Sequence, residues 1–244
     1  MSLNAQNSTI YYELFDNTKD VYEGVTMNSI SEKNNVSYWN EFYKKVTLDE
    51  ESTFCTFIKE EIKEDVVIID IGCGSGRDTR SFAKEGYQVY GIDRSTEAIM
   101  MNNENVKHIS NIEFFNIDIS DESKLQNCIY EIIATEKNCT KKLMIYSRFF
   151  LHSINKETEI ILLHILSKIL KSEDLLVLEF RTIEDEKIEK VYSDHYRRYI
   201  DSDGLKKDLE VKYGFSTEFY YKGQGLSIYE NEDPYLARMI LKKK

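Results

Sequence analysis

The chain has 244 residues, of which 41% are hydrophobic, and a formal net charge of −11 at pH 7. This length suits one α/β domain with a short appendage, and the hydrophobic content is enough for a sizeable core. The acidic balance excludes general nucleic-acid binding and docking on anionic membranes, because both depend on positive charge at the protein surface. We therefore expect no nucleic-acid partner.

Membrane, export and metal signals are missing from the sequence. No apolar run approaches the length of a membrane-spanning helix, and residues 1–17 lack the basic and apolar regions of a signal peptide. No CxxC spacing occurs among the four cysteines, which argues against a zinc site or a disulfide framework: Cys55, Cys73, Cys128 and Cys139. We expect a cytoplasmic protein without membrane insertion and without a bound metal. The oligomeric state is not predicted.

Two helices are predicted before the first strand. Residues 1–36 are polar and weakly patterned, and Ser37 can cap a first helix. That helix carries an apolar stripe at helical spacing: Tyr38, Trp39, Phe42, Tyr43 and Val46. A second helix is predicted over about 50–63. We therefore divide the chain into a helical lid or appendage, residues 1–63, and a main unit, residues 64–244.

Strands and helices alternate from residue 64 onward. The β-branched run at 66–71 is typical of a strand buried on both faces. Ser95 and Asn155 are candidate helix N-caps. Further strands are predicted at 87–93, 112–117, 143–147 and within 174–181, with helices at 77–86, 95–104, 122–135 and 156–171. A charged helical stretch at about 184–210 precedes β-type segments near 213–222, 225–230 and 235–242.

This alternation predicts an α/β fold with βαβ units and a mostly parallel, doubly wound sheet. The last β-type segments favour an antiparallel pair at the edge of that sheet. In such sheets ligands bind at the carboxyl ends of the strands, near the point where the strand order reverses. Polar residues that directly follow the strands are therefore the first candidates for a functional site.

The strongest motif follows the first strand and opens a helix: Asp70-Ile71-Gly72-Cys73-Gly74-Ser75-Gly76-Arg77-Asp78. Glycines let the backbone turn sharply and approach a ligand closely. A second acid, Asp93, ends the second strand about twenty residues further on, where it can bind two ribose hydroxyls. A third acid, Asp118, follows the third strand.

This combination resembles the class I S-adenosylmethionine (SAM) dependent methyltransferases over about residues 65–182. The resemblance implies a Rossmann-like sheet of seven strands, with SAM as cofactor and S-adenosylhomocysteine (SAH) as product. It places Gly72 and Gly74 at the methionine part of SAM and Asp70 at its ammonium group. It also implies Asp93 at the ribose, with Asp118 and Ile119 beside the adenine. Further expected cofactor contacts are Arg77, Ser147, Trp39 and Tyr43.

The role of the aromatic stripe stays open at this point. Trp39 and Tyr43 can close over SAM with their faces toward its sulfonium, because cations are attracted to aromatic faces. They can equally be core residues of the first helix. The two readings differ in whether the rings line the cofactor site.

Arginines mark the ends of the fourth and fifth strands. The sequence Tyr146-Ser147-Arg148-Phe149-Phe150-Leu151-His152 replaces the Asn/Asp-Pro-Pro-Tyr motif of many nitrogen methyltransferases, which argues against adenine-N6 or glutamine methylation. Arg181 follows Glu179 at the end of the fifth strand, and His195 and Arg197 come soon after. Because the arginine fork binds carboxylate or phosphate in a bidentate way, we expect an anionic acceptor.

Each of these residues also has a structural interpretation. Arg148 can pair with Glu179 across neighbouring strands, and Arg197 and Arg198 can be solvated surface. His152 can be a hydrogen-bonded core histidine.

The wider set of motifs resembles a narrower bacterial group, the class I methyltransferases of surface-polysaccharide assembly and the tellurite-resistance-like enzymes. That resemblance spans nearly the whole chain and implies a sugar, sugar-phosphate or polymer-end acceptor. A sugar hydroxyl needs a general base, for which His152 and His195 are candidates, with Glu179 as base or orienter. A phosphate or carboxylate oxygen needs only positioning, by Arg148, Arg181 and Arg197. The alternatives are a methyltransferase for small metabolites, thiols or metalloid oxyanions, and a SAM-binding regulator without catalysis.

Overall fold

The computed structural model describes residues 29–45, 49–136, 141–191 and 195–244, with side chains from residue 37 onward. Residues Asn34–Lys244 form one compact unit. Of the other unit, Met1–Lys33, only the start of helix α2 (Ser29–Lys45) is described. This helix begins before the predicted Ser37 cap. The predicted segment 1–28, Val46 and Cys139 lie outside the described residues.

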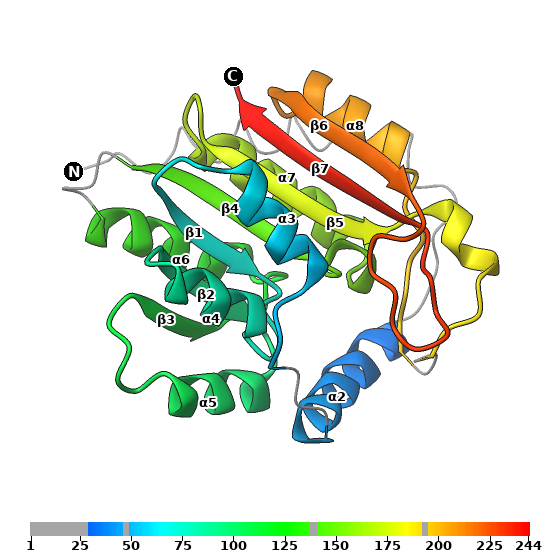
Figure 1. Ribbon diagram of the computed structural model, residues 1–244, viewed down its shortest axis with the longest axis horizontal. Coiled ribbons are helices and arrows are strands. Elements are labelled where there is room, and N and C mark those ends of the chain that lie inside the picture. The colour runs from blue at the N-terminus through cyan, green and yellow to red at the C-terminus, as the bar shows by residue number, and fades with distance from the viewer. Residues whose placement is uncertain (1–28, 46–48, 137–140, 192–194) are drawn as a thin grey trace, which may run out of the picture. The chain divides into compact units, whose positions relative to one another are not determined.

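A seven-stranded sheet with the order β3-β2-β1-β4-β5-β7-β6 forms the centre of the unit (Figure 1). Neighbouring strands are parallel from β3 to β5, and β7 is antiparallel to both β5 and β6. The strands are β1 Val66–Ile71, β2 Gln88–Asp93, β3 Ile112–Asn116, β4 Lys142–Arg148, β5 Leu175–Arg181, β6 Phe215–Gly223 and β7 Leu236–Lys243. The predicted fold class is therefore confirmed, and the strand order reverses between β1 and β4.

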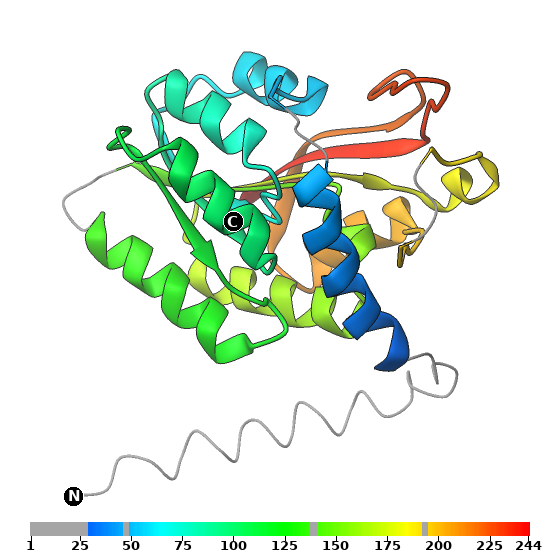
Figure 2. The same ribbon diagram turned by 90° about the horizontal axis from the view of Figure 1, so that it is seen from below.

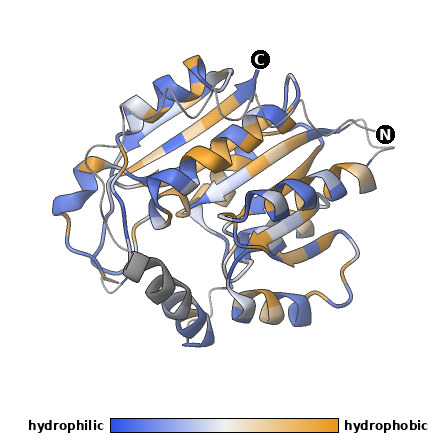
Figure 3. Cartoon of the chain, turned by 180° about the vertical axis from the view of Figure 1, so that it is seen from behind, coloured by the Kyte–Doolittle hydropathy of each residue, from blue (hydrophilic) through white to orange (hydrophobic). Residues whose placement is uncertain are grey.

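Helices cover both faces of this sheet (Figure 2). One core cluster joins the sheet to α3 (Thr53–Glu61), α4 (Arg77–Lys84) and α5 (Thr96–Asn105). The other cluster joins the sheet to α6 (Glu122–Thr135), α7 (Lys156–Ile169) and α8 (Ser202–Val211). Figure 3 shows the hydrophobic residues along the strands and on the helix faces that meet them.

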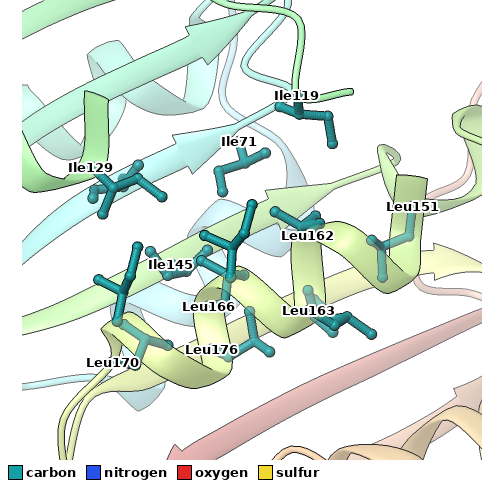
Figure 4. Close-up of a cluster of buried hydrophobic side chains, with 14 of the residues drawn as sticks. Ile71, Ile119, Ile129, Ile145, Leu151, Leu162, Leu163, Leu166, Leu170 and Leu176 are labelled. Atoms are coloured by element: carbon teal, nitrogen blue, oxygen red, sulfur yellow. The ribbon is translucent and has the colours of Figure 1, made fainter. Parts of the chain in front are cut away.

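The packing of α7 shows how the sequence pattern becomes core. Its leucines Leu162 and Leu166 lie four residues apart, so they share one face of the helix. That face meets Ile145 of β4 and Leu176 of β5 in the buried cluster (Figure 4). Asn155 caps the helix by accepting from the backbone N–H of Thr158, as predicted. Ser95 likewise caps α5 by accepting from Ala98.

Two predicted segments differ from the structure. Within 184–210 only the short 3-10 helix η3 (Ile183–Lys187) and α8 are helical, and the described residues between them are irregular. The backbone N–H of Arg198 donates to the carbonyl of His152 there, and its side chain donates to two further carbonyls. These tertiary contacts outweigh the local helical tendency.

The predicted strand at 225–230 is instead part of the loop 224–235 between β6 and β7. Gly225 has φ +77°, which is left-handed backbone that a regular strand cannot contain. The carboxylate of Asp233 accepts from the Gly225 backbone N–H at 2.7 Å and holds the turn. The loop extends past the carboxyl end of β5, beside the predicted site.

Candidate functional site

A cavity of about 390 Å³ opens at the carboxyl ends of β1, β2, β4 and β5. Helix α2 and the loop 224–235 complete its lining. Most predicted site residues line it: Trp39, Tyr43, Asp70, Gly72, Gly74, Arg77, Asp93, Arg148, His152, Arg181, His195 and Arg197. We call the part at β1 and β2, with Asp70, Gly72, Gly74 and Asp93, the glycine-loop side. The part at β4 and β5, with Arg148, His152 and Arg181, is the arginine side, to which His195 and Arg197 also belong.

Glycines are required at two positions of the glycine-loop side. Gly72 and Gly74 have φ +78° and +52°, which L side chains rarely adopt. A Cβ on Gly72 would lie 2.3 Å from the ring of Phe150, and a Cβ on Gly74 would lie 2.3 Å from the Tyr43 hydroxyl. The loop therefore packs tightly under two aromatic side chains.

Two carboxylates flank this loop. Asp70 is 2% exposed and accepts from the Thr79 hydroxyl at 2.6 Å. Burial raises the pKa of Asp70 to about 8. Asp93 accepts from the backbone N–H of Gly74 at 3.0 Å with one oxygen and from Ser95 at 2.8 Å with the other. Each oxygen of Asp93 keeps a further lone pair.

An aromatic cluster on α2 covers the cavity. The ring centroids of Trp39 and Tyr43 lie 5.9 Å apart in a stacked arrangement, and Tyr38 directly precedes Trp39 on the same helix. His195 stacks on Tyr38 at 4.9 Å and lies 5.0 Å from Trp39. Burial, with the carboxylate of Asp93 as a second cause, raises the pKa of the Tyr43 hydroxyl. The stripe therefore faces the cavity as well as packing on itself.

Arg148 belongs to a chain of charges, of which the sequence indicated only the pair with Glu179. Its Nε donates to Glu179 at 2.9 Å, and the other oxygen of Glu179 accepts from Nε of Arg238 at 2.7 Å. Glu179 is 1% exposed, so one buried carboxylate serves two guanidinium groups. Nη2 of Arg148 donates to the Ser227 hydroxyl, and Nη1 makes no hydrogen bond to any described residue. Arg148 thus pairs with Glu179, as its structural interpretation required, and also lines the cavity.

Arg238 connects this pair to the loop 224–235. It donates to the carbonyl of Leu226 and to the Thr53 hydroxyl, both at 2.9 Å. Arg238 lies 59 residues from Glu179 in the chain. Only the antiparallel register, in which Glu179 faces Arg238, could have indicated the contact.

Arg181 is held differently from Arg148. Its Nη1 lies 2.7 Å from Asp185 and its Nη2 lies 2.5 Å from Glu232, and all three side chains are buried. Two carboxylates therefore neutralise this guanidinium.

Arg197 lies in contact with His195, with 3.0 Å between Nη2 and Nε2. Arg198 is not solvated surface, since it pairs with the buried Glu159.

Phe149 stands between the arginines and has an unusual backbone. Its φ is +54°, which is uncommon for any residue except glycine, and its backbone N–H donates to the Glu179 carbonyl at 2.8 Å. The guanidinium carbon of Arg148 lies 4.1 Å from the ring centroid, and that of Arg181 lies 5.5 Å from it. Residues in such conformations cluster at functional sites.

His152 is both buried and part of the cavity lining. Its Nδ1 accepts from the backbone N–H of Arg181 at 3.2 Å. Burial, together with the positive charges of Arg181 and Arg197, lowers the pKa of the ring well below its usual value. The ring is therefore neutral, with its hydrogen on Nε2.

Four predicted site residues lie outside the cavity lining. Asp118 is exposed and accepts from Ser120, and Ile119 is buried in the core beside α6 (Figure 4). Ser147 donates to the carbonyl of Ile71, which joins β4 to β1 behind the glycine loop. Glu179 lies behind Arg148.

Within the described ranges, no group of three or more acidic, histidine or cysteine residues is arranged to hold a metal ion. No described helix is long and apolar enough to cross a membrane.

Asp78 is the centre of a buried hydrogen-bond cluster that was not predicted. Asp78 is buried and accepts from the backbone N–H and the hydroxyl of Ser52, and from the Tyr146 hydroxyl, each at 2.7 Å. Ser52 is the N-cap of α3, so the cluster fixes that helix to β4 and α4. The Gly76-Arg77-Asp78 order at the end of the motif was the one available signal for Asp78.

Comparisons with known proteins agree with this geometry. Residues 62–200, more than half of the chain, match a family model described as a methyltransferase domain. A search of curated proteins finds no match. The fold resembles that of a SAM-dependent methyltransferase from Anabaena variabilis ATCC 29413, with a TM-score of 0.67 and 18% identity over 89% of this chain and 96% of that chain.

Two further solved structures share the fold at lower similarity. TehB from Haemophilus influenzae has a TM-score of 0.59 and 16% identity over 86% of this chain and 67% of that chain. A Burkholderia thailandensis 1,6-didemethyltoxoflavin-N1-methyltransferase, with bound 1,6-didemethyltoxoflavin and SAH, has a TM-score of 0.58 and 13% identity over 90% and 93%. At such identities the likeness is one of fold. The family match, the strand order and the glycine loop together show that the chain belongs to the methyltransferase-domain family, as a class I SAM-dependent methyltransferase.

Proposed function

We propose that the protein transfers the methyl group of SAM to an oxygen of an anionic acceptor, either a small molecule or the end of a glycan. One observation carries the choice of an anion. The guanidinium groups of Arg148 and Arg238 share the single carboxylate of Glu179, which leaves a surplus positive charge at the cavity. Arginine is well suited to bind carboxylate or phosphate in that position.

The glycine-loop side fits the cofactor in shape and charge. Asp93 has two oxygens with spare lone pairs for the ribose hydroxyls, and Asp70 offers a buried carboxylate to the ammonium group. Gly72 and Gly74 leave room for the backbone to approach the methionine part. Arg77 lines the cavity at the start of α4 and can face the cofactor carboxylate. Trp39 and Tyr43 cover this side.

The cofactor supplies a methyl group on a sulfonium, whose thioether is a good leaving group. The protein therefore contributes mainly alignment and exclusion of water. Arg148 holds the acceptor from β4, while the aromatic rings of α2 keep water from the cofactor. Arg197 and the neutralised Arg181 complete the arginine side. In this proposal, the aromatic residues of α2 contribute the cover, and residues 64–244 contribute the two binding sides.

A screen of acceptors with labelled SAM tests the proposal. We expect turnover of uronic acids, sugar phosphates or acidic oligosaccharides, and none of their neutral counterparts. Turnover of metalloid oxyanions or small thiols without glycan activity would overturn the glycan part. Binding of SAH without transfer to any acceptor would favour a regulator.

A further inference from the structure

We propose that the methyl group is placed on the charged oxygen itself, a carboxylate or phosphate oxygen of the acceptor, and not on a neighbouring hydroxyl. This inference rests on the proposed function and identifies the atom that reacts. A hydroxyl must lose its proton during the transfer, so it needs a general base within hydrogen-bond reach. The basic side chains on the arginine side are already engaged.

Neither ring nitrogen of His152 is available to accept a proton from the acceptor. A backbone N–H can only donate, so the bond from Arg181 to Nδ1 uses the lone pair of that nitrogen. The other nitrogen, Nε2, then carries the ring hydrogen. His152 can therefore donate a hydrogen bond to an acceptor oxygen, which suits an anion and not a hydroxyl that must lose its proton.

His195 is engaged in a similar way. A guanidinium has donors and no acceptor, so Nη2 of Arg197 must donate to Nε2 of His195 across their 3.0 Å contact. The ring also stacks on Tyr38 and lies against Trp39, which fixes its plane. Protonating Nε2 would set two cationic groups against each other.

The carboxylates of the arginine side are also committed. Glu179 accepts from two arginines, and Glu232 accepts from the backbone N–H of Val191 at 2.8 Å while it pairs with Arg181. Asp78 accepts three hydrogen bonds at the border with the glycine-loop side. Three acids of the lining remain. Asp70 and Asp93 lie on the glycine-loop side, and Glu51 accepts from Thr56, Lys59 and Ser81.

An ionised acceptor removes the need for a base. Its oxygen already holds the electron pair that forms the new O–CH₃ bond, and the electrons of the S–CH₃ bond remain on sulfur. The negative charge of the oxygen and the positive charge of the sulfonium disappear together, so no proton is released. A hydroxyl acceptor would release one proton for each methyl group. Without a base, its transfer would be slower by about 10²–10⁴-fold.

The test uses the full chain, labelled SAM and three probes: glucuronic acid, glucose 6-phosphate and methyl glucoside, a neutral hydroxyl control. Protons are counted per transferred methyl in weakly buffered solution with an indicator dye. We expect transfer to an acidic probe with close to no proton released. The glucuronate product should lose its label as methanol in mild alkali, because it is an ester. A methylated phosphate should resist alkaline phosphatase.

The outcomes separate this inference from the proposed function. An alkali-stable methyl ether, or one proton released per methyl, overturns the inference and leaves the anionic acceptor standing. Transfer to methyl glucoside at a rate similar to glucuronate overturns both. Binding of SAH by calorimetry, with no transfer to any of the three probes or to the wider acidic panel, overturns the proposed function and the inference that rests on it.

Discussion

The glycine-loop side of the cavity is shaped by backbone, whereas the arginine side is shaped by charged side chains from distant segments. Gly72 and Gly74 form the first side within three residues, through φ angles that only glycine adopts easily. The second side needs Arg148 from β4, Glu179 from β5 and Arg238 from β7. The two sides should therefore fail in different ways: the first through local geometry, the second through loss of charge balance.

The largest effect is expected on the arginine side, for Glu179→Gln. The substitution leaves two buried guanidinium groups without their shared carboxylate, which should cost about 3 kcal/mol of unfolding free energy. Urea unfolding of the variant and the parent measures it. Glu184→Gln is the matched control, because Glu184 pairs with Lys222 at the surface and should change stability by less than about 1 kcal/mol. Equal midpoints for the two variants would remove the special role of the shared carboxylate.

Gly74→Ala should damage the glycine-loop side by a comparable but smaller amount. The new Cβ meets the Tyr43 hydroxyl, and the φ of +52° strains any L residue. The strain lowers stability by about 1–3 kcal/mol, and because the Cβ also displaces the Tyr43 ring that covers the cofactor site, we expect SAH to bind about 10- to 100-fold more weakly in calorimetry.

Gly86→Ala is the control for strain alone. Gly86 has φ +92°, and a Cβ there would have no atom within 4 Å. This variant should lose stability while its affinity for SAH stays within about twofold of the parent. If both glycine variants weaken SAH equally, the contact with Tyr43 is irrelevant and the comparison of the two sides fails.

Arg148→Lys separates charge from geometry on the arginine side. Lysine keeps the positive charge but loses the fork that contacts Glu179 and Ser227. We expect transfer to the acidic acceptor to fall by about tenfold or more, with SAH affinity within about threefold of the parent. Arg198→Lys is the control, because Arg198 pairs with Glu159 and does not line the cavity. Loss of SAH binding in Arg148→Lys would assign this arginine to the cofactor.

The glycine-loop side comes from a local motif and the arginine side from distant segments, and this difference explains how much of the site could be predicted from the sequence. The glycine motif, Asp93 and the aromatic stripe of α2 are local patterns, and strand ends in a parallel sheet lie along one edge. Their place in the cavity followed from the order of elements. Arg238 and Glu232 could not be found this way, because they meet Glu179 and Arg181 only after the antiparallel strand β7 is in register.

For the predicted adenine contacts, a local motif was present but did not predict where the side chains lie. Asp118 and Ile119 were assigned by their position after β3, the edge strand. In the structure the side chain of Ile119 joins the core under α6, and Asp118 forms a turn with Ser120. Alternation along the chain sends these neighbours in different directions, so a position in a motif did not predict where each side chain points. Their contact with the cofactor stays a prediction.

The smallest expected effect is a pH dependence that belongs to the glycine-loop side alone. Burial raises the pKa of Asp70 to about 8, so its carboxyl is mostly protonated at pH 7 and mostly ionised at pH 9. Only the ionised form attracts the ammonium of SAH, so the affinity should rise as the pH increases through 8. The ionised fraction of Asp70 sets the size of this increase in SAH affinity, which should be about tenfold or less between pH 7 and pH 8.5. Calorimetry across that range should show a flat profile for Asp70→Asn and an unchanged slope for Asp118→Asn. If the affinity for SAH falls as the pH rises, the ammonium group binds elsewhere. If the pH dependence disappears in Arg148→Lys, the two sides of the cavity do not act independently.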